Sequence, residues 1–403
     1  MKGKIFITTY GGGHVNMVLP VIRKLKALGF DVVVLGLTTA GSVLARNDID
    51  YIGFKDLVAL SSNPERVLEV GKRLLGENNS GLVSREESIA YMGLSYDNLE
   101  QMEGVAKAAE LFHQSGRQCF YPLLLMSDLL RLEKPDVVIA TNSPRAEKAT
   151  IDAAKKIGIP TVCLVDLFAI QEIEWIGENE YADKVCVLSE YVKDLMLSAG
   201  RDSEAVVVTG NPAFDGLIPW KEKVKQRQGI DRFEKRNILW ASQPEPEMHP
   251  FTKQKGDSQL PRKIEQELFS LAEKNPSLSI VLRPHPSEEL YYERLPCNIR
   301  LSENEDLYEL LSQMDLVVVM SSTVGLEASL LDIPVVSVDT SVFTEDAPYS
   351  DMGVSIGVDD ISALNKTILS VLHAPKSSAD KSKLVLEGSA TDNVVGVIIG
   401  MMK

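Results

Sequence analysis

The first forty residues contain a strand pattern, a glycine cluster, a helix pattern and a second strand pattern, in that order. Residues 4–9 and 31–37 are mainly apolar, β-rich runs, and residues 15–28 between them have the 3.6-residue periodicity of a helix. This order predicts a βαβ unit, in which the two strands pair in parallel. Because the runs are almost continuously apolar rather than alternating, we expect helices on both faces of the sheet.

The same alternation recurs along the 403 residues, a length that exceeds what one hydrophobic core usually serves. It predicts an α/β fold of two doubly wound, Rossmann-like domains with a cleft between them. We expect a first domain in residues 1–210, a linker in 211–236, a second domain in 237–385 and a terminal helix in 386–403. Residues 63–131 have a helical and loop-like pattern to which no order of elements is assigned. Further strands are expected at 136–140, 161–165, 184–188, 205–209, 237–240, 279–282, 315–320 and 334–338.

Composition argues against several functional classes. The formal net charge is −15, so we expect no nucleic-acid partner. No apolar run reaches the ~20 residues of a transmembrane helix, and the N-terminus lacks the apolar stretch of a signal peptide. The four cysteines show no C-x-x-C spacing, which suits a reducing compartment. These features predict a cytoplasmic protein, for which peripheral membrane contact stays open.

Ligands of doubly wound sheets bind beyond the carboxyl ends of the strands, so residues that directly follow a strand are candidates for a site. The first strand is followed by Gly11, Gly12, Gly13 and His14. Glycines let backbone N–H groups approach a ligand closely, and the helix that starts here favours an anion. A tight turn alone would need fewer glycines. His14 is either an acid/base group in the cleft or a structural residue of the helix start.

Carboxylates of the first half supply the candidate general base. Asp166 comes directly after the strand at 161–165, and Glu172 and Glu174 lie nearby. We select His14 and Asp166 as the catalytic candidates.

Two loops of the second half carry further candidate ligands. Arg283 and His285 follow the strand at 279–282, and flanking prolines stiffen the backbone that holds them. A phosphate, a ribose or the edge of a base could use both side chains. Glu345 and Asp346 lie on the loop after the strand at 334–338, where they either hold sugar hydroxyls or are solvated loop acids.

The clearest site pattern lies between the strand at 315–320 and the following helix. Ser321, Ser322 and Thr323 offer hydroxyls and backbone N–H groups at a helix start, which suits a diphosphate. Gly325 and Glu327 follow within the first turns, and a carboxylate at 327 can accept both hydroxyls of a ribose. An ordinary helix cap explains the same residues, and the two interpretations are compatible.

The sequence offers no metal-binding motif near the predicted site. There is no H-x-x-x-H or H-E-x-x-H pattern, and no D-x-D pair lies near the loop at 321–327, so we expect no metal and no cofactor. There is also no P-loop, so an NTPase interpretation lacks support.

The whole chain resembles the GT-B superfamily of sugar-nucleotide glycosyltransferases and the related non-hydrolysing UDP-GlcNAc 2-epimerases. The resemblance is carried by residues 206–212 with Asp215, by residues 321–334 and by residues 388–393. It implies that the phosphates lie on Ser321 to Thr323 and that the uracil-bearing ribose lies on Glu327. It also implies that the last helix returns to the first domain.

Two loops depart from the epimerase pattern. Epimerases have a Gly-Thr-Arg-Pro-Glu loop after the first strand, whereas residues 11–14 here are more similar to the lipid-linked GlcNAc transferase of cell-wall synthesis. The His-Arg-Arg-Glu loop of epimerases is replaced by Ser-Gln-Pro-Glu at 242–245. The combination of His285-Pro286 with Ser321-Ser322 also resembles sialyl- and Kdo-transferases that use CMP-sugars, which leaves the donor base open.

These patterns predict a glycosyltransferase that moves a sugar from a nucleotide donor, UDP-HexNAc-like by resemblance, to a hydroxyl acceptor without metal. The alternatives are a UDP-sugar 2-epimerase or a sugar-nucleotide hydrolase, which act on the donor alone, a CMP-sugar transferase, and an inactive nucleotide-sugar sensor. The acceptor is a saccharide, a lipid-linked group or a small molecule, and a homodimer stays open.

Overall fold

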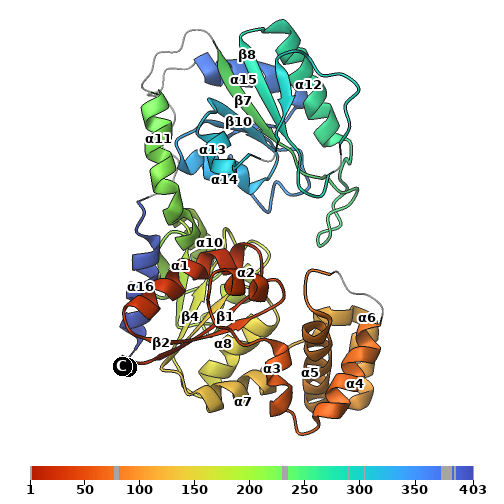
Figure 1. Ribbon diagram of the computed structural model, residues 1–403, viewed down its shortest axis with the longest axis vertical. Helices are drawn as coiled ribbons and strands as arrows, with labels where there is room; N and C mark the ends of the chain where they lie inside the picture. Colours follow the sequence, from red (N-terminus) through yellow and green to blue (C-terminus); the bar gives the residue numbers. More distant parts are fainter. Residues whose placement is uncertain are drawn as a thin grey trace. The chain divides into compact units, whose positions relative to one another are not determined.

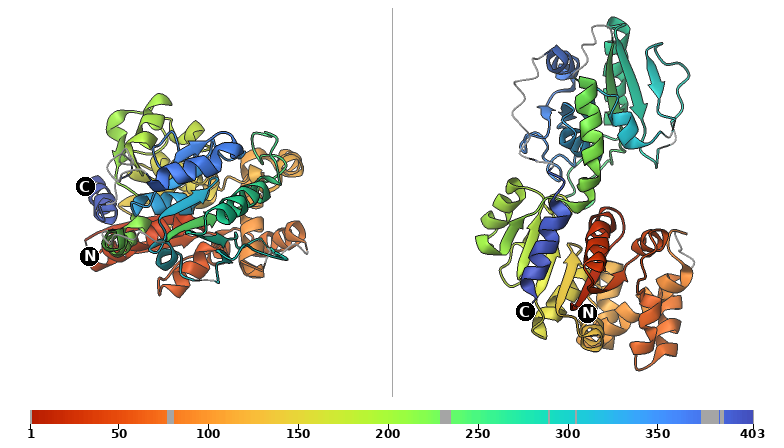
Figure 2. Two further views of the ribbon diagram at one scale, coloured as in Figure 1. Left: turned by 90° about the horizontal axis from the view of Figure 1, so that it is seen from above. Right: turned by 60° about the vertical axis from the view of Figure 1, so that its left-hand side comes forward.

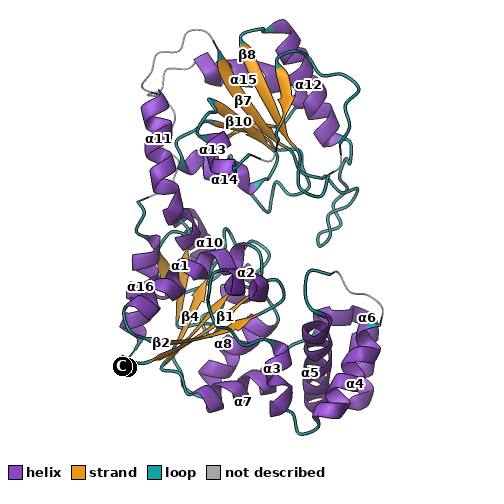
Figure 3. Ribbon diagram, in the orientation of Figure 1, coloured by secondary structure: helices purple, strands orange, loops and turns teal. Residues whose placement is uncertain are grey.

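The computed structural model describes residues 2–76, 81–228, 235–288, 290–303, 305–373, 384 and 387–402. Contacts divide the chain into two compact units: unit 1 is Met1–Ala213 with Ser389–Lys403, and unit 2 is Phe214–Gly388. Each unit has one parallel sheet of its own with helices packed against it (Figures 1 and 3).

The sheet of unit 1 consists of β1 Lys4–Thr9, β2 Asp31–Gly36, β3 Val137–Thr141, β4 Thr161–Leu164, β5 Lys184–Val187 and β6 Val206–Val208. These six strands are parallel and lie in the order β2-β1-β3-β4-β5-β6. Ile7 in β1 pairs with Val34 on one side and with Ile139 on the other. The central strands are buried on both faces, which is why their sequences are continuously apolar.

Helices from both ends of the chain cover one part of this sheet. They include α1 Gly13–Ala27 and α16 Ala390–Met401, which lie side by side (Figure 2). Lys24 on α1 and Asp392 on α16 form an ion pair of 2.8 Å. Val394, Val395 and Ile398 of α16 join the apolar core under α1 and β1. The C-terminal helix therefore belongs to unit 1.

A group of helices, α3 to α7, is inserted between β2 and β3. The helices Pro64–Leu75 and Arg85–Glu103 pack closely through glycines. A Cβ atom on Gly71 would stand 2.1 Å from the carbonyl oxygen of Ile89, and a Cβ atom on Gly93 would stand 2.1 Å from the carbonyl oxygen of Val67. Tyr96 and Phe120 are among the residues of the separate apolar core here. The helices are α3 Phe54–Leu57, α4 Pro64–Leu75, α5 Arg85–Glu103, α6 Val105–Ser115 and α7 Leu123–Glu133.

The sheet of unit 2 consists of β7 Arg236–Ala241, β8 Leu278–Arg283, β9 Ile299–Leu301, β10 Leu316–Val319, β11 Val335–Val338 and β12 Ile356–Val358. Its order is β12-β11-β10-β7-β8-β9, and all strands are parallel. The fully buried Trp240 anchors a core between this sheet and its helices, and its indole N–H donates to Glu265 at 3.3 Å. The helices are α11 Ile218–Gln228, α12 Leu260–Lys274, α13 Leu307–Leu311, α14 Thr323–Leu330 and α15 Leu364–His373.

The α/β class with two doubly wound sheets is confirmed, but several elements differ from the sequence-based expectation. The segment 211–236, expected as a linker, contains the 3₁₀ helix Pro212–Leu217 and α11, and Arg227 binds the Met314 carbonyl at 2.7 Å and Asp315 at 3.1 Å. Residues 218–228 are therefore a packed helix of unit 2. The edge strands β9 and β12 and the helices α12 and α15 were not expected. The expected domain end at 385 lies outside the described residues.

Helices α8 Ala146–Lys156 and α10 Glu190–Ser198 complete the part of unit 1 that positions the site. Among the residues that the structure describes, no helix combines the length and the apolar character needed to cross a membrane.

Candidate functional site

At the carboxyl edge of the unit 1 sheet, the chain turns from β1 into α1 through the glycine cluster. Gly12 has a φ of 68°, which side-chain-bearing residues rarely adopt, and it caps α1. Gly13 lies against Asp166, because a Cβ atom on Gly13 would stand 2.3 Å from Oδ2 of Asp166. Glycine at position 13 thus lets α1 begin directly beside this carboxylate.

The imidazole of His14 lies between two carboxylates. Its Nδ1 is 3.8 Å from Oε1 of Glu147, and its Nε2 is 4.0 Å from Oδ2 of Asp166. Burial alone would lower the pKa of His14, but the negative charges of Glu147, Asp166 and Glu172 together outweigh burial and raise the pKa above its usual value. The ring is thus a half-buried proton carrier next to two proton acceptors.

Glu147, at the start of α8, was not among the predicted site residues. Its side chain is fully buried, and its carboxylate accepts hydrogen bonds from the backbone N–H groups of Tyr10 at 2.7 Å and Ser143 at 2.6 Å. The Thr141 hydroxyl also donates to it. Glu147 therefore ties the loops after β1 and β3 together and places a fixed negative charge beneath His14. Its position six residues after a strand end was the only signal in the sequence.

Two asparagines hold Asp166 after β4. The Asp166 N–H donates to Oδ1 of Asn142 at 2.8 Å, and Nδ2 of Asn211 donates to Oδ1 of Asp166 at 3.4 Å. Burial raises the pKa of Asp166, although the charge of His14 and the bond from Asn211 partly offset this effect. Asp166 and His14, the two predicted catalytic residues, thus lie in one cluster, and both have raised pKa values.

In unit 2, three neighbouring strands end with polar residues. Ser321 follows β10, Gln243 follows β7, and Arg283 is the last residue of β8. Nε2 of Gln243 donates to Oγ of Ser321 at 2.6 Å, so the serine hydroxyl is oriented by a residue that the sequence did not single out. This strand edge therefore carries the hydroxyl, amide and guanidinium groups that polyanion binding uses.

Helix α14 starts beside these strand ends. The Ser322 hydroxyl accepts from the Val324 N–H at 3.4 Å and caps the helix, and the Tyr349 hydroxyl donates to the Ser322 carbonyl at 3.0 Å. Gly325 allows close packing, since a Cβ there would stand 2.9 Å from Cγ2 of Val319. Thr323 is the exposed first residue of α14. The remaining N–H groups of the first turn favour an anion.

Glu327 lies one turn into α14, and only one of its two carboxylate oxygens has a hydrogen-bond donor among the described residues. Its Oε1 accepts from the Tyr308 hydroxyl at 3.3 Å, whereas its buried Oε2 has no hydrogen-bond partner among the described residues. Burial raises the pKa of Glu327 to about 7, and the bond from Tyr308 offsets only part of this shift. The carboxylate is therefore ready to accept a further hydrogen bond.

Arg283 and His285 lie close to this edge but have local partners. Nη1 of Arg283 donates to the Ser302 hydroxyl at 3.3 Å and to the Glu305 carbonyl at 3.0 Å. His285 is exposed, and its Nδ1 lies 2.7 Å from the Ser287 hydroxyl. No contact in the described part of the chain joins either residue to Ser321 or Glu327.

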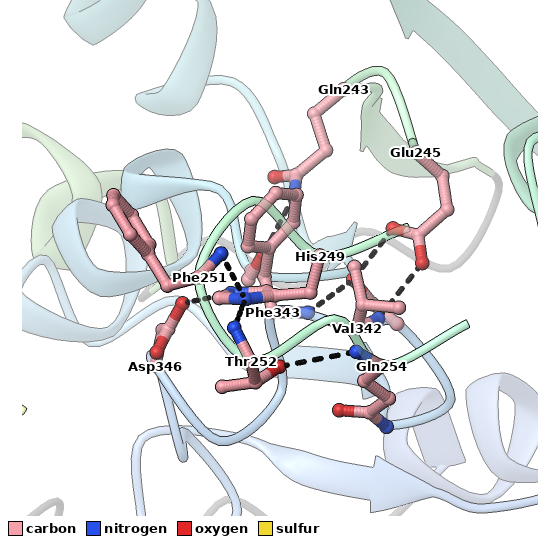
Figure 4. A network of polar contacts seen from close by, with 11 residues as sticks. Gln243, Glu245, His249, Phe251, Thr252, Gln254, Val342, Phe343 and Asp346 are labelled. Carbon is pink, nitrogen blue, oxygen red and sulfur yellow. Dashed lines mark hydrogen bonds and ion pairs between the residues drawn. The ribbon is translucent and has the colours of Figure 1, made fainter. Parts of the chain in front are cut away.

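Asp346, predicted as a sugar ligand, holds a buried histidine (Figure 4). Nδ1 of His249 accepts from the N–H groups of Phe251 at 3.2 Å and Thr252 at 3.0 Å, so the ring proton is on Nε2, which donates to Oδ2 of Asp346 at 2.8 Å. This pair fastens the loop after β7 to the loop after β11. The neighbouring Glu345 is exposed.

Glu245 forms a second connection between the loop after β7 and the loop after β11. This buried carboxylate accepts from the Ser341 hydroxyl and from the Val342 N–H, both at 2.8 Å. Across the described ranges, no group of three or more histidine, cysteine, aspartate or glutamate residues is placed to hold a metal ion.

Comparison with known structures gives the same fold at low sequence identity. The UDP-GlcNAc 2-epimerase of Methanocaldococcus jannaschii is 15% identical with a TM-score of 0.60, and the match covers 98% of this chain and 99% of that chain. The Neisseria meningitidis UDP-GlcNAc 2-epimerase, solved with UDP-GlcNAc bound, is 17% identical with a TM-score of 0.59 and coverages of 98% and 100%. MurG of Acinetobacter baumannii is 15% identical with a TM-score of 0.56 and coverages of 98% and 99%.

Comparison of the amino-acid sequence with known sequences and family models identifies the family of this chain. Comparison with curated protein sequences gives no match. The family model described as UDP-N-acetylglucosamine 2-epimerase matches residues 123–398, which include Asp166 of unit 1 and the whole of unit 2. The chain therefore belongs to the UDP-N-acetylglucosamine 2-epimerase family.

Proposed function

We propose that the protein binds a UDP-linked N-acetylhexosamine and inverts the sugar at C2 without an acceptor. The observation that carries the proposal is the half-satisfied carboxylate of Glu327 beside the capped start of α14, in a chain of this family. The sequence favoured glycosyl transfer and kept epimerisation as the alternative, and the family match supports the alternative better.

The nucleotide end of the substrate fits unit 2. Oε2 of Glu327 lacks a donor among the described residues, and the hydroxyls of a ribose are donors at the right spacing for one carboxylate. The N–H groups at the start of α14 and the hydroxyls of Ser321, Ser322 and Thr323 supply donors for a diphosphate. Uracil is the base that the family name implies.

The part of the site that holds the sugar needs side chains that can remove a proton from C2 and return one to it. The C2 proton of the hexosamine is not acidic by itself, so its removal must be coupled to cleavage of the C1–O bond. The C–H electron pair then forms a C1=C2 double bond, and UDP leaves with the C1–O electron pair. Return of UDP to C1 and of a proton to the opposite face of C2 gives the epimer.

The unit 1 cluster provides two groups for these proton transfers. Asp166 and His14 both have raised pKa values, lie within 4.0 Å of each other, and are held by separate partners. We assign the exchange of the C2 proton to this pair, in which Glu147 favours the charged form of the imidazole.

Glycosyl transfer is the second candidate, and the loop of residues 11–14 favours it. Residues 11–14 are Gly-Gly-Gly-His, whereas the epimerase pattern is Gly-Thr-Arg-Pro-Glu. The fold is also shared with MurG and with a glycotransferase of kitacinnamycin, which has a TM-score of 0.58 at 12% identity. A transferase would leave the donor intact when no acceptor is present.

Incubation with UDP-GlcNAc alone in D₂O, followed by NMR, distinguishes these activities. Epimerisation gives deuterium at C2 and a second UDP-sugar, whereas hydrolysis that follows elimination gives free deuterated sugar and UDP. An unchanged spectrum at high enzyme concentration, from protein that binds UDP-GlcNAc by calorimetry, would contradict epimerisation and favour transfer.

A further inference from the structure

Unit 1 contains a cavity of about 630 Å³ that none of the groups proposed for proton transfer lines. It lies between the sheet edge and the helices α3 to α5, and its volume is within the range of about 300–1,000 Å³ found for small-molecule sites. Its walls come from residues of unit 1 alone. The cavity reaches Tyr10 and Ala146, which adjoin the glycine loop and Glu147 in the sequence.

One side of the cavity is apolar and aromatic. Phe54, Tyr91 and Met92 line it, and the rings of Phe54 and Tyr91 pack edge to face with centroids 5.1 Å apart. Leu75 extends the same surface. Such a wall binds a flat or aliphatic group by excluding water from it.

Two guanidinium groups line the cavity as well, from Arg117 and Arg145. Within the described part of the chain neither forms an ion pair with a carboxylate, and the buried Nε of Arg145 has no hydrogen-bond partner. The contacts of Arg145 are to Tyr10, whose ring lies 5.9 Å from Cζ and whose hydroxyl lies 3.5 Å from Nη2. A buried donor without an acceptor is costly, so this arginine lacks a partner that a ligand can supply.

The carboxylate that also lines the cavity already has partners. Glu87 accepts from the N–H groups of Phe54 at 2.7 Å and Lys55 at 3.0 Å, so it caps the start of α3. Its charge is held by these two backbone donors. The two arginines therefore leave the cavity with a net attraction for anions.

We propose that this cavity is a second ligand site, which binds an organic anion whose carboxylate, phosphate or sulfonate contacts Arg145 and Arg117 and whose apolar body lies on Phe54 and Tyr91. None of the groups assigned to the nucleotide-sugar lines this cavity, so the proposal does not depend on the proposed function. A guanidinium pair fixes the charged group by bidentate hydrogen bonds, and the aromatic wall selects ligands that carry a ring or an alkyl body.

Two fluorescent probes that differ only in the anionic group test the proposal on the full chain. 8-Anilinonaphthalene-1-sulfonate carries a sulfonate on an aromatic body, and N-phenyl-1-naphthylamine has the same body without it. We expect saturable 1:1 binding of the sulfonate. Arg145→Met should weaken it at least tenfold, and Arg117→Met should weaken it by a smaller factor because Arg117 is exposed. Binding of the neutral probe should change less than twofold.

Two further variants separate the site from general surface effects. Arg131→Met removes an exposed arginine of α7 outside the cavity and should leave both affinities unchanged. Ser88→Trp places an indole in the cavity and should abolish binding of both probes. Circular dichroism checks that each variant keeps the wild-type fold.

Two results would overturn the proposal. One is that Arg145→Met and Arg117→Met, with wild-type fold, leave sulfonate affinity unchanged. The other is competition of UDP-GlcNAc with the sulfonate for the wild-type protein, which would make the cavity part of the nucleotide-sugar site itself. Failure of the NMR experiment above would leave the probe result unaffected, so the two proposals can fail separately.

Discussion

At the scale of single residues, two glutamates show how partners distinguish a structural carboxylate from one that can bind a ligand. Glu147 is fully buried but accepts from Tyr10, Thr141 and Ser143, so its cost of burial is met within the protein. Glu327 has only the long bond from Tyr308, and its second oxygen is buried without a donor in the described structure. A buried acceptor without a donor costs about 1–3 kcal/mol, which indicates a role in binding rather than in folding.

Glu327→Gln should weaken UDP-GlcNAc binding by about 1–3 kcal/mol in calorimetry at pH 8. In the wild type, affinity should increase as the pH rises through about 7, because burial raises the pKa of Glu327 to about 7 and only the ionised carboxylate accepts from both ribose hydroxyls without a competing O–H of its own. The phosphates of UDP-GlcNAc do not titrate there. The variant should show no such increase, and Glu309→Gln, an exposed change on α13, should keep it. Equal pH profiles for variant and wild type would contradict the ribose assignment.

His14→Ala should lower the rate of C2 hydrogen–deuterium exchange about 10²–10⁴-fold and change UDP-GlcNAc affinity little. The reason is that the neighbouring carboxylates raise the pKa of His14, which favours the charged ring that can donate a proton. Where the imidazolium acts as the acid, the wild-type rate should fall as the pH rises above this raised pKa. His113→Ala, on the exposed face of α6, is the matched control. Wild-type exchange in His14→Ala would make the histidine structural.

At the scale of elements, the glycine loop and α1 set the position of the acid/base groups. A side chain at Gly13 would displace Asp166, whereas one at Gly12 meets no atom within 4 Å and is opposed only by its φ of 68°. Gly13→Ala should therefore reduce exchange more strongly than Gly12→Ala in steady-state assays, with UDP affinity kept in both. Gly12→Ala and Gly12→Val should mainly lower stability, by about 1–3 kcal/mol in denaturant titrations. Equal loss of exchange in both alanine variants would refute this role for Gly13.

The sequence predicts an element well when the residues within that element determine its structure. Buried parallel strands such as β1 and β10 are continuously apolar, so their place and order were readable, and the glycines and serines that follow them marked the strand ends. The three-residue edge strands β9 and β12 carry exposed residues and lack that signal.

The partners of the site residues follow from tertiary packing, which no local pattern encodes. Tyr308 reaches Glu327 from another helix, and His249 reaches Asp346 across 97 positions of sequence. For the same reason the sequence singled out His14 and Asp166 but not Glu147, whose partners lie at the end of β3 and in the loops after β1 and β3.

At the scale of the whole molecule, the two units have separate cores, and the proposed function gives them separate roles. Hydrogen-exchange mass spectrometry should show UDP protecting unit 2 peptides that contain α13 and the start of α14. UDP-GlcNAc should additionally protect unit 1 peptides around residues 10–14 and 166, because we assign the sugar to these groups. The Glu327→Gln variant at the same ligand concentration is the control and should lose protection in both units. Protection by UDP confined to unit 1 would contradict the division of roles.

The exchange of the C2 proton should not require a divalent metal ion. This prediction concerns the substrate site as a whole. The start of α14 offers backbone N–H groups and hydroxyls to a diphosphate, and Arg283 uses only Nη1 for its contacts with Ser302 and Glu305, so other donors of its guanidinium remain for phosphate. We expect the rate of deuterium exchange at C2 in excess EDTA to remain within about twofold of the untreated rate. Arg283→Met should reduce this rate with and without EDTA alike. A complete loss in EDTA that Mg²⁺ or Mn²⁺ restores would show that a metal ion, rather than these groups, neutralises the leaving diphosphate.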